Sequence, residues 1–171
     1  MNQARPGAPL PDQNPPGSEY DLKYKLAFLN GIFLVAALMA LGLGVFRWQL
    51  SPVLAAFDFG FSLAAFALLH YLRRHPERVE AAASIALVLA FILFFAIYLL
   101  APYQTNRLSL FFLLSASAFF LKGIRIGLAW LAFIIVAIVA THFVPGVGTG
   151  FSGIDIATTC LYLGALFFIF W

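Results

Sequence analysis

The sequence predicts an all-α integral membrane protein, a bundle of six transmembrane helices with both termini in the cytoplasm. The chain of 171 residues is 63% hydrophobic and only 10% charged, whereas soluble domains average roughly 45–50% apolar and 25% charged residues. Several of its apolar runs carry no charge and reach about 18 residues or more, the length that a helix needs to cross a bilayer. The alternating segments typical of a transmembrane β-barrel are absent from the sequence.

The first 19 residues differ in composition from the rest of the chain. Residues 1–18 are rich in proline, glycine, asparagine and glutamine, and they lack the apolar core of a signal peptide. We therefore expect residues 1–19 to form a disordered cytoplasmic tail and residues 20–171 to form one transmembrane domain.

The first three spans are delimited by interfacial and helix-breaking residues. Arg47 and Trp48 end the first span, because a cation and an aromatic residue favour the membrane interface. Ser51-Pro52 supplies a hydroxyl cap and a proline at the first helical position of the second span. Pro76 separates the second span from the third, and Pro102 ends the third. These spans are residues 26–46, 53–72 and 79–100.

The last three spans are separated by a basic turn and a glycine-rich loop. The polar stretch 104–107 precedes an aromatic-rich fourth span, and Lys122-Gly-Ile-Arg125 separates that span from the fifth. The uncharged loop 144–153 leads to the sixth. These spans are residues 105–121, 124–143 and 154–170. Because the connections are short, neighbouring helices should be antiparallel.

Lysine and arginine residues are distributed unevenly between the two predicted sides. One side carries eight of them, namely Arg5, Lys23, Lys25, Arg73, Arg74, Arg78, Lys122 and Arg125. The other side carries Arg47 and Arg107. Cytoplasmic loops are enriched in these residues, so both termini are predicted to be cytoplasmic. The net charge is +3, and the cations sit in short clusters at helix ends. In a membrane protein this clustering is an orientation signal and indicates no nucleic-acid partner.

Asp58 is the most informative single residue, because it lies inside the second span about two turns from its outer end. An ionised carboxylate near the bilayer centre costs roughly 2.5–3.5 kcal/mol and usually has a partner. One interpretation is a ligand or proton site. The other is a structural pair with Arg47, or a protonated and hydrogen-bonded carboxyl group.

Other polar residues fall at the outer helix ends. Arg47, Arg107, His142 and Asp155 lie there, near Asp58 and the stretch 104–106. We expect Asp58, Arg47, Arg107, His142 and Asp155 to bind a small or amphiphilic signal molecule in a shallow pocket. The alternative is that each residue only marks the membrane interface.

The sequence lacks the motifs of common catalytic and metal sites. It has no nucleotide-binding glycine loop, no His-Glu-x-x-His motif and no nucleophile with an evident base. Cys160 is the only cysteine, and His70 and His75 have no third ligand nearby in the sequence. We therefore expect this segment to be no enzyme and to hold no cofactor or metal.

One stretch resembles a known family. Thr105-Asn-Arg107, Ser109-Leu-Phe-Phe112 and Ala118-Phe-Phe-Leu-Lys-Gly-Ile-Arg-Ile-Gly127 are similar to the middle of the multi-helix sensor modules at the N-termini of bacterial diguanylate cyclases. Unlike many of those modules, this aromatic helix has no Trp or Pro. The resemblance implies a signal receiver in the bacterial inner membrane, usually dimeric, joined to a cytoplasmic domain that makes cyclic di-GMP.

Two further observations bear on function. No polar residue follows the sixth span, so we expect a cytoplasmic output domain to continue beyond it and to be controlled through that span. Two other functions stay open: a small secondary transporter with Asp58 as its proton- or ion-coupled carboxylate, and a scaffold subunit that only packs against a membrane partner.

Overall fold

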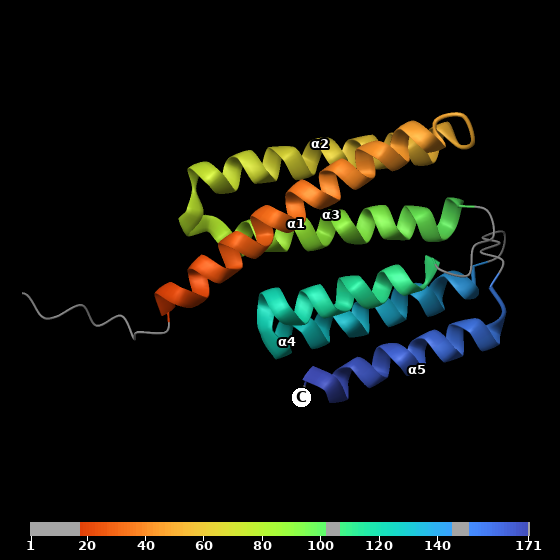
Figure 1. The fold of residues 1–171 in the computed structure, drawn as a ribbon. Coiled ribbons are helices and arrows are strands. Elements are labelled where there is room, and N and C mark those ends of the chain that lie inside the picture. Colours follow the sequence, from red (N-terminus) through yellow and green to blue (C-terminus); the bar gives the residue numbers. More distant parts are fainter. Residues whose placement is uncertain (1–17, 102–106, 145–150, 171) are drawn as a thin grey trace, which may run out of the picture.

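The computed structural model describes residues 18–101, 107–144 and 151–170, and in these ranges the chain is helical with no strand (Figure 1). The predicted N-terminal tail lies outside the described residues up to residue 17. The helices are α1 (Ser18–Arg47), α2 (Pro52–Arg74), the short 3-10 helix η1 (Pro76–Arg78), α3 (Val79–Leu100), α4 (Ser109–His142) and α5 (Gly153–Phe170).

Four of the described helices are long and apolar enough to cross a membrane. They are α1, α2, α3 together with η1, and α4, while α5 is a shorter apolar helix. Large apolar side chains are exposed along them, including Leu38, Met39 and Leu63. Such surfaces are unfavourable in water but suit contact with lipid. The chain is therefore an all-helical, multi-pass membrane protein.

The helix α4 doubles back on itself at Gly123. Gly123 has φ 75° and ψ 178°, a backbone conformation that is open essentially only to glycine. The ring of Tyr98 lies 5.8 Å from that of Phe111, and its hydroxyl lies 3.3 Å from that of Thr141. A straight helix would separate Phe111 from Thr141 by about 45 Å. The arms 109–122 and 124–142 are thus antiparallel (Figure 1).

The helix ends gather at two opposite ends of the bundle (Figure 1). The start of α1, the α2–α3 connection, the Gly123 turn and the end of α5 lie at one end, here called the Gly123 end. The α1–α2 turn, the end of α3, both termini of α4 and the start of α5 lie at the other, here called the Arg47 end.

The described helices do not coincide with the predicted membrane spans. α1 begins at Ser18, eight residues before the predicted first span and within the last two residues of the predicted tail. The polar residues before the apolar run continue the helix, because a helix does not have to end where the membrane does. α4 begins at Ser109, and the predicted start of the fourth span at residue 105 lies outside the described ranges.

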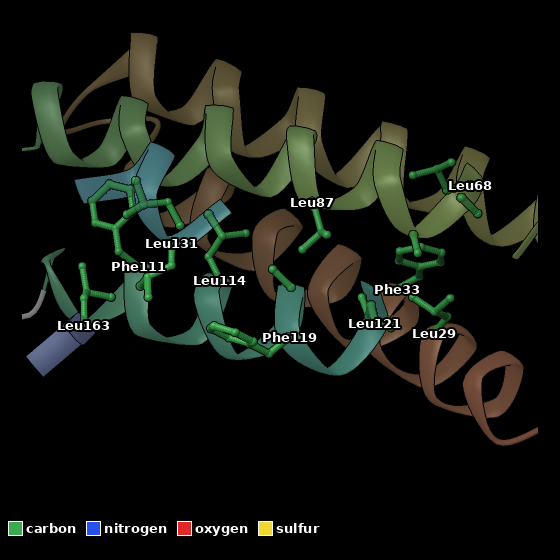
Figure 2. Packing of buried hydrophobic residues seen from close by; sticks show 14 of the residues in the cluster. Leu29, Phe33, Leu68, Leu87, Phe111, Leu114, Phe119, Leu121, Leu131 and Leu163 are labelled. Atoms are coloured by element: carbon green, nitrogen blue, oxygen red, sulfur yellow. The ribbon is translucent and has the colours of Figure 1, made fainter. Parts of the chain in front are cut away.

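A continuous apolar core joins the helices. Leu29 and Phe33 of α1 pack with Leu121 of α4 at one end of this core, and Leu163 of α5 packs near Phe111 at the other (Figure 2). The α1–α2 contact is the most extensive in the bundle. Within this interface, the Ser62 hydroxyl donates a hydrogen bond of 2.8 Å to the carbonyl of Ala37. This tie fixes the register in which α2 carries Asp58 past α1.

Candidate functional site at the Arg47 end

Arg47 and Asp58 form a buried ion pair between α1 and α2. The Arg47 Nη1 atom lies 3.0 Å from Asp58 Oδ2 and 3.3 Å from Oδ1. The Asp58 side chain is only 1% exposed, whereas the Arg47 side chain is 21% exposed. Both carboxylate oxygens are therefore turned to the same guanidinium group, and water reaches the pair mainly from the arginine side.

The turn between α1 and α2 positions this pair. The carbonyl of Arg47 accepts hydrogen bonds from the backbone N–H groups of Leu50 (3.0 Å) and Ser51 (2.8 Å). Pro52 then starts α2 with its φ already near the helical value. Asp58 follows almost two turns later, on the face of α2 that packs against α1.

Arg107 closes the end of α3. Its Nη1 atom donates a 3.0 Å hydrogen bond to the carbonyl of Tyr98 and a second hydrogen bond to the carbonyl of Ala101. The last carbonyls of a helix lack intrahelical partners and carry partial negative charge. Arg107 is only 3% exposed, and its guanidinium satisfies both the hydrogen-bonding and the electrostatic requirement.

Arg107 also connects α3 to the start of α5. Its guanidinium carbon lies 4.9 Å from the centre of the Phe151 ring, within cation–π range. Phe151 in turn stacks on Tyr98 with ring centres 5.7 Å apart. Tyr98 reaches both arms of α4 through Phe111 and Thr141. We call Tyr98, Arg107, Phe111, Thr141 and Phe151 the Tyr98 cluster.

Asp155 caps the start of α5. The backbone N–H and the hydroxyl of Ser152 each donate a hydrogen bond of 2.9 Å to Asp155 Oδ2, and the Ser152 hydroxyl accepts one of 3.2 Å from the Asp155 N–H. This reciprocal arrangement is a capping box. In this box, Oδ2 of Asp155 accepts both hydrogen bonds from Ser152 at the start of the helix.

His142 is the most peripheral of the five predicted residues. It is exposed at the end of α4, and its ring meets that of Phe143 edge-on at 5.7 Å. All five predicted residues thus lie at the Arg47 end, but in separate settings: the ion pair, the Tyr98 cluster, the α5 cap and the exposed end of α4. The predicted contribution of residues 104–106 lies outside the described residues.

A shallow hollow of about 260 Å³ lies beside the Tyr98 cluster. We call it the outer hollow. Its walls come from α4 and α5, with Phe151 at the edge. Leu108, Phe112 and Tyr162 supply apolar surface, and Asp155 and Thr158 supply polar groups. Of the predicted residues, Asp155 lines it directly and Arg107 reaches it through Phe151.

Tyr98 and Phe151 are the site residues that sequence reasoning missed. Tyr98 occurs near the end of an apolar run, where a tyrosine ordinarily marks the membrane interface, yet here it is 0% exposed. Phe151 lies in a glycine-rich loop. No local signal in the sequence connects them, because they are brought together only when the residue pair before α5 packs against the end of α3.

The chain has no match among protein families, curated proteins or solved structures. In the ranges that the structure describes, no three His, Cys, Asp or Glu side chains gather as a metal site would require.

Proposed function

We propose that this chain is the signal-receiving domain of a bacterial inner-membrane protein. It crosses the membrane six times with both termini in the cytoplasm, and α5 transmits the signal to a cytoplasmic output domain. The observation that carries the proposal is the unequal attachment of α5. Among the described helices, only α4 makes extensive contact with α5, while Phe151, two residues before α5, is held by Tyr98 and Arg107.

Two of the last three segments approach the length of a full crossing. The arm 124–142 of α4 contains 19 residues, or about 28 Å, and the 18 residues of α5 extend about 27 Å. The arm 109–122 contains 14 residues, or about 21 Å, and is the shortest of the proposed crossings. The hydrocarbon core of a bilayer is about 30 Å thick. The Gly123 turn lies at the same end as the start of α1 (Figure 1), and the lysines and arginines gathered at that end favour the cytoplasm.

The mechanism requires two packing states of α5. A signal shifts the balance between them only if it binds one state more tightly than the other. A small or amphiphilic molecule entering the outer hollow meets Phe151, Asp155 and α4 together. Displacing Phe151 from Tyr98 and Arg107 releases the start of α5 from α3, and α5 then moves relative to α4.

A diguanylate cyclase is the output domain that the sequence resemblance of residues 105–127 suggests, and homodimers are the expected assembly.

The transport alternative gives Asp58 a different role, because a coupled carboxylate must bind and release an ion. With both oxygens facing Arg47 within 3.3 Å, Asp58 would have to leave this partner in every cycle.

The first test reads the gene beyond the codon for Trp171 and measures cyclic di-GMP in cells that express the whole product. Phe151→Ala should change the cyclic di-GMP level severalfold while membrane insertion is retained. Phe143→Ala is the matched control, since Phe143 lies at the same end and is 76% exposed. A frame that stops after Trp171, or equal output from the two variants, would overturn the proposal.

Two further assays separate the alternatives. A transporter would move a solute or protons in vesicles when a proton gradient is applied, and Asp58→Asn would abolish that movement. A scaffold would be recovered in a stable complex with another membrane protein and would tolerate the same substitution.

A further inference from the structure

A second hollow, of about 280 Å³, runs between α1 and α4 with α3 as its floor. We call it the inner groove. Its lining is almost wholly apolar, with Leu29 and Met39 on α1, Ala90 on α3, and Leu113 and Leu121 on α4. Leu29 and Leu121 lie near the Gly123 end (Figure 2), so the groove extends from that end toward the middle of the bundle.

The dimensions of the inner groove fit one lipid chain. Leu29 and Met39 are ten residues apart on one helix, which corresponds to about 15 Å. One leaflet contributes about half of a hydrocarbon core roughly 30 Å thick. The groove therefore covers the depth of one leaflet, the one whose headgroups lie at the Gly123 end.

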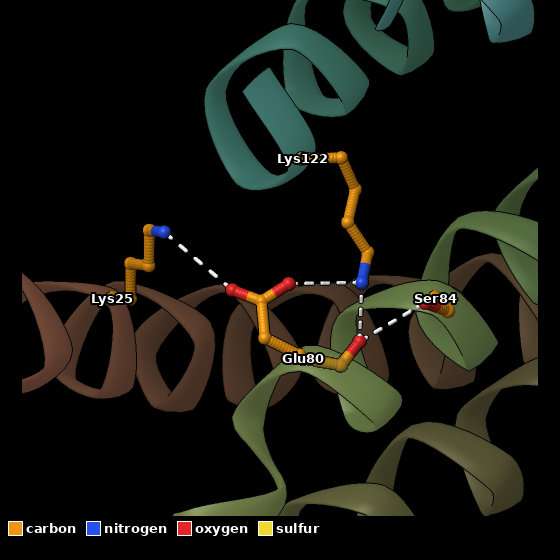
Figure 3. Close-up of polar contacts among 4 residues, drawn as sticks. All are labelled: Lys25, Glu80, Ser84 and Lys122. Atoms are coloured by element: carbon orange, nitrogen blue, oxygen red, sulfur yellow. Dashed lines mark hydrogen bonds and ion pairs between the residues drawn. The ribbon is translucent and has the colours of Figure 1, made fainter. Parts of the chain in front are cut away.

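A charged cluster stands at the headgroup end of the groove (Figure 3). Glu80 of α3 lies 3.5 Å from Lys25 Nζ of α1 and 3.0 Å from Lys122 Nζ of α4. Lys122 also donates a hydrogen bond to the Glu80 carbonyl. Two ammonium groups therefore approach the same carboxylate, one on each of its oxygens. Its members come from the three helices that form the groove.

The same end of the bundle carries further positive charge. From residue 18 onward, its cations are Lys23, Lys25, Arg73, Arg74, Arg78, Lys122 and Arg125, and its acids are Glu19, Asp21, Glu77 and Glu80. Seven cations against four acids leave an excess of three. Basic pockets between transmembrane helices attract anionic headgroups, with about 1 kcal/mol for each cation near the surface.

We propose that the inner groove binds an anionic glycerophospholipid. One acyl chain lies along α3 between α1 and α4, and the phosphate lies beside Lys25 and Lys122, where it competes with the Glu80 carboxylate. Glu80 is 59% exposed at its side chain, so it can turn away into water. The position of the lipid headgroup at this end of the groove follows from the cluster of Lys25, Glu80 and Lys122. The assignment of this end to the cytoplasmic leaflet rests on the orientation in the proposed function.

A bound lipid would strengthen the contact between α1 and α4. Next to this groove, α1 meets α4 through the rings of Phe28 and Phe120, whose centres are 4.6 Å apart, and through the shared carboxylate of Glu80. An acyl chain in the groove adds contact to both helices along its length. Removal of the lipid should therefore loosen α1 against α4.

The test is native mass spectrometry of the purified chain in detergent, titrated with phosphatidylglycerol or phosphatidylcholine of the same chain length. The chain should retain phosphatidylglycerol more strongly. Lys122→Gln should weaken that binding about fivefold, the factor expected for the loss of about 1 kcal/mol. Arg125→Gln is the control, because Arg125 is exposed, does not line the groove and loses the same charge at the same end of the bundle.

A second variant tests the groove itself. Ala90→Phe should fill the groove and weaken both lipids, whereas Ala67→Phe, at an exposed position on α2, should weaken neither. Equal retention of the two lipids, or unchanged binding by Lys122→Gln, would overturn the proposal. Competition by glycerol phosphate or inorganic phosphate alone would also overturn it, since that result describes a site for a soluble anion. If Ala90→Phe fails to fold, the comparison of Lys122→Gln with Arg125→Gln decides.

Discussion

Removing Arg47 is expected to destabilise the domain more than removing the charge of Asp58, although the two residues form one ion pair. Arg47→Gln leaves a carboxylate that is 1% exposed, with no cation beside it. Asp58→Asn leaves a guanidinium that is already 21% exposed at the end of α1. That cation can extend to the interface, and it still interacts favourably with the C-terminal carbonyls of its helix.

The structure sets the size of this difference. Breaking a buried pair by removing one partner costs about 3–5 kcal/mol. We expect a loss of about 3–5 kcal/mol in the free energy of unfolding for Arg47→Gln and about 1–2 kcal/mol for Asp58→Asn. The double variant, which buries no charge, should be more stable than Arg47→Gln alone.

The assay is reversible unfolding in mixed micelles, followed by circular dichroism, for the two single variants, the double variant and Arg125→Gln. Equal losses for the single variants, or strictly additive losses in the double variant, would refute the reasoning.

Three other substitutions test the backbone of the bundle by the same unfolding assay. Gly123→Ala should cost about 1–3 kcal/mol because its φ of 75° is strained for alanine. Gly127→Ala should cost about 1–3 kcal/mol because its Cβ would lie 2.4 Å from a ring carbon of Phe119 and 2.9 Å from the Phe119 Cα. Asp155→Ala should cost about 1 kcal/mol and increase hydrogen exchange in the first turn of α5, since it removes half of the cap. Gly164→Ala, where an added Cβ meets nothing within 4 Å, is the control for both glycines, and a loss there equal to theirs would contradict the steric argument.

The helices could be predicted from the sequence because the signals that define them are local. Apolar runs gave the helical segments, and Pro52 and Pro76 mark the starts of α2 and η1. The basic turn gave the break at Gly123, where a positive φ is needed. α1 begins eight residues before the predicted first span, since membrane boundaries and helix boundaries follow different physical requirements.

The candidate site was less predictable because most of its contacts join distant residues. Arg47 and Asp58 are eleven residues apart, and a short turn between two helices was enough to suggest their pairing. Tyr98 and Phe151 are far apart in the chain, so their stacking depends on how three helices pack. The cap at Asp155 did have a local signal, because Ser152-x-x-Asp155 has the spacing of a capping box.

The arm 109–122 of α4 contributes residues to both the outer hollow and the cluster at the inner groove. Its first turn lines the outer hollow through Ser109 and Phe112, and its last residue, Lys122, belongs to the cluster at the inner groove. These positions are separated by about four turns of one continuous helix, or about 20 Å. If the signal proposed for the outer hollow rotates this arm as α5 moves against it, Lys122 also moves relative to Glu80. Coupling between two binding sites is reciprocal. An anionic lipid that favours one position of the arm should therefore change the affinity of the protein for the signal. The signal should change the affinity for the lipid by the same factor.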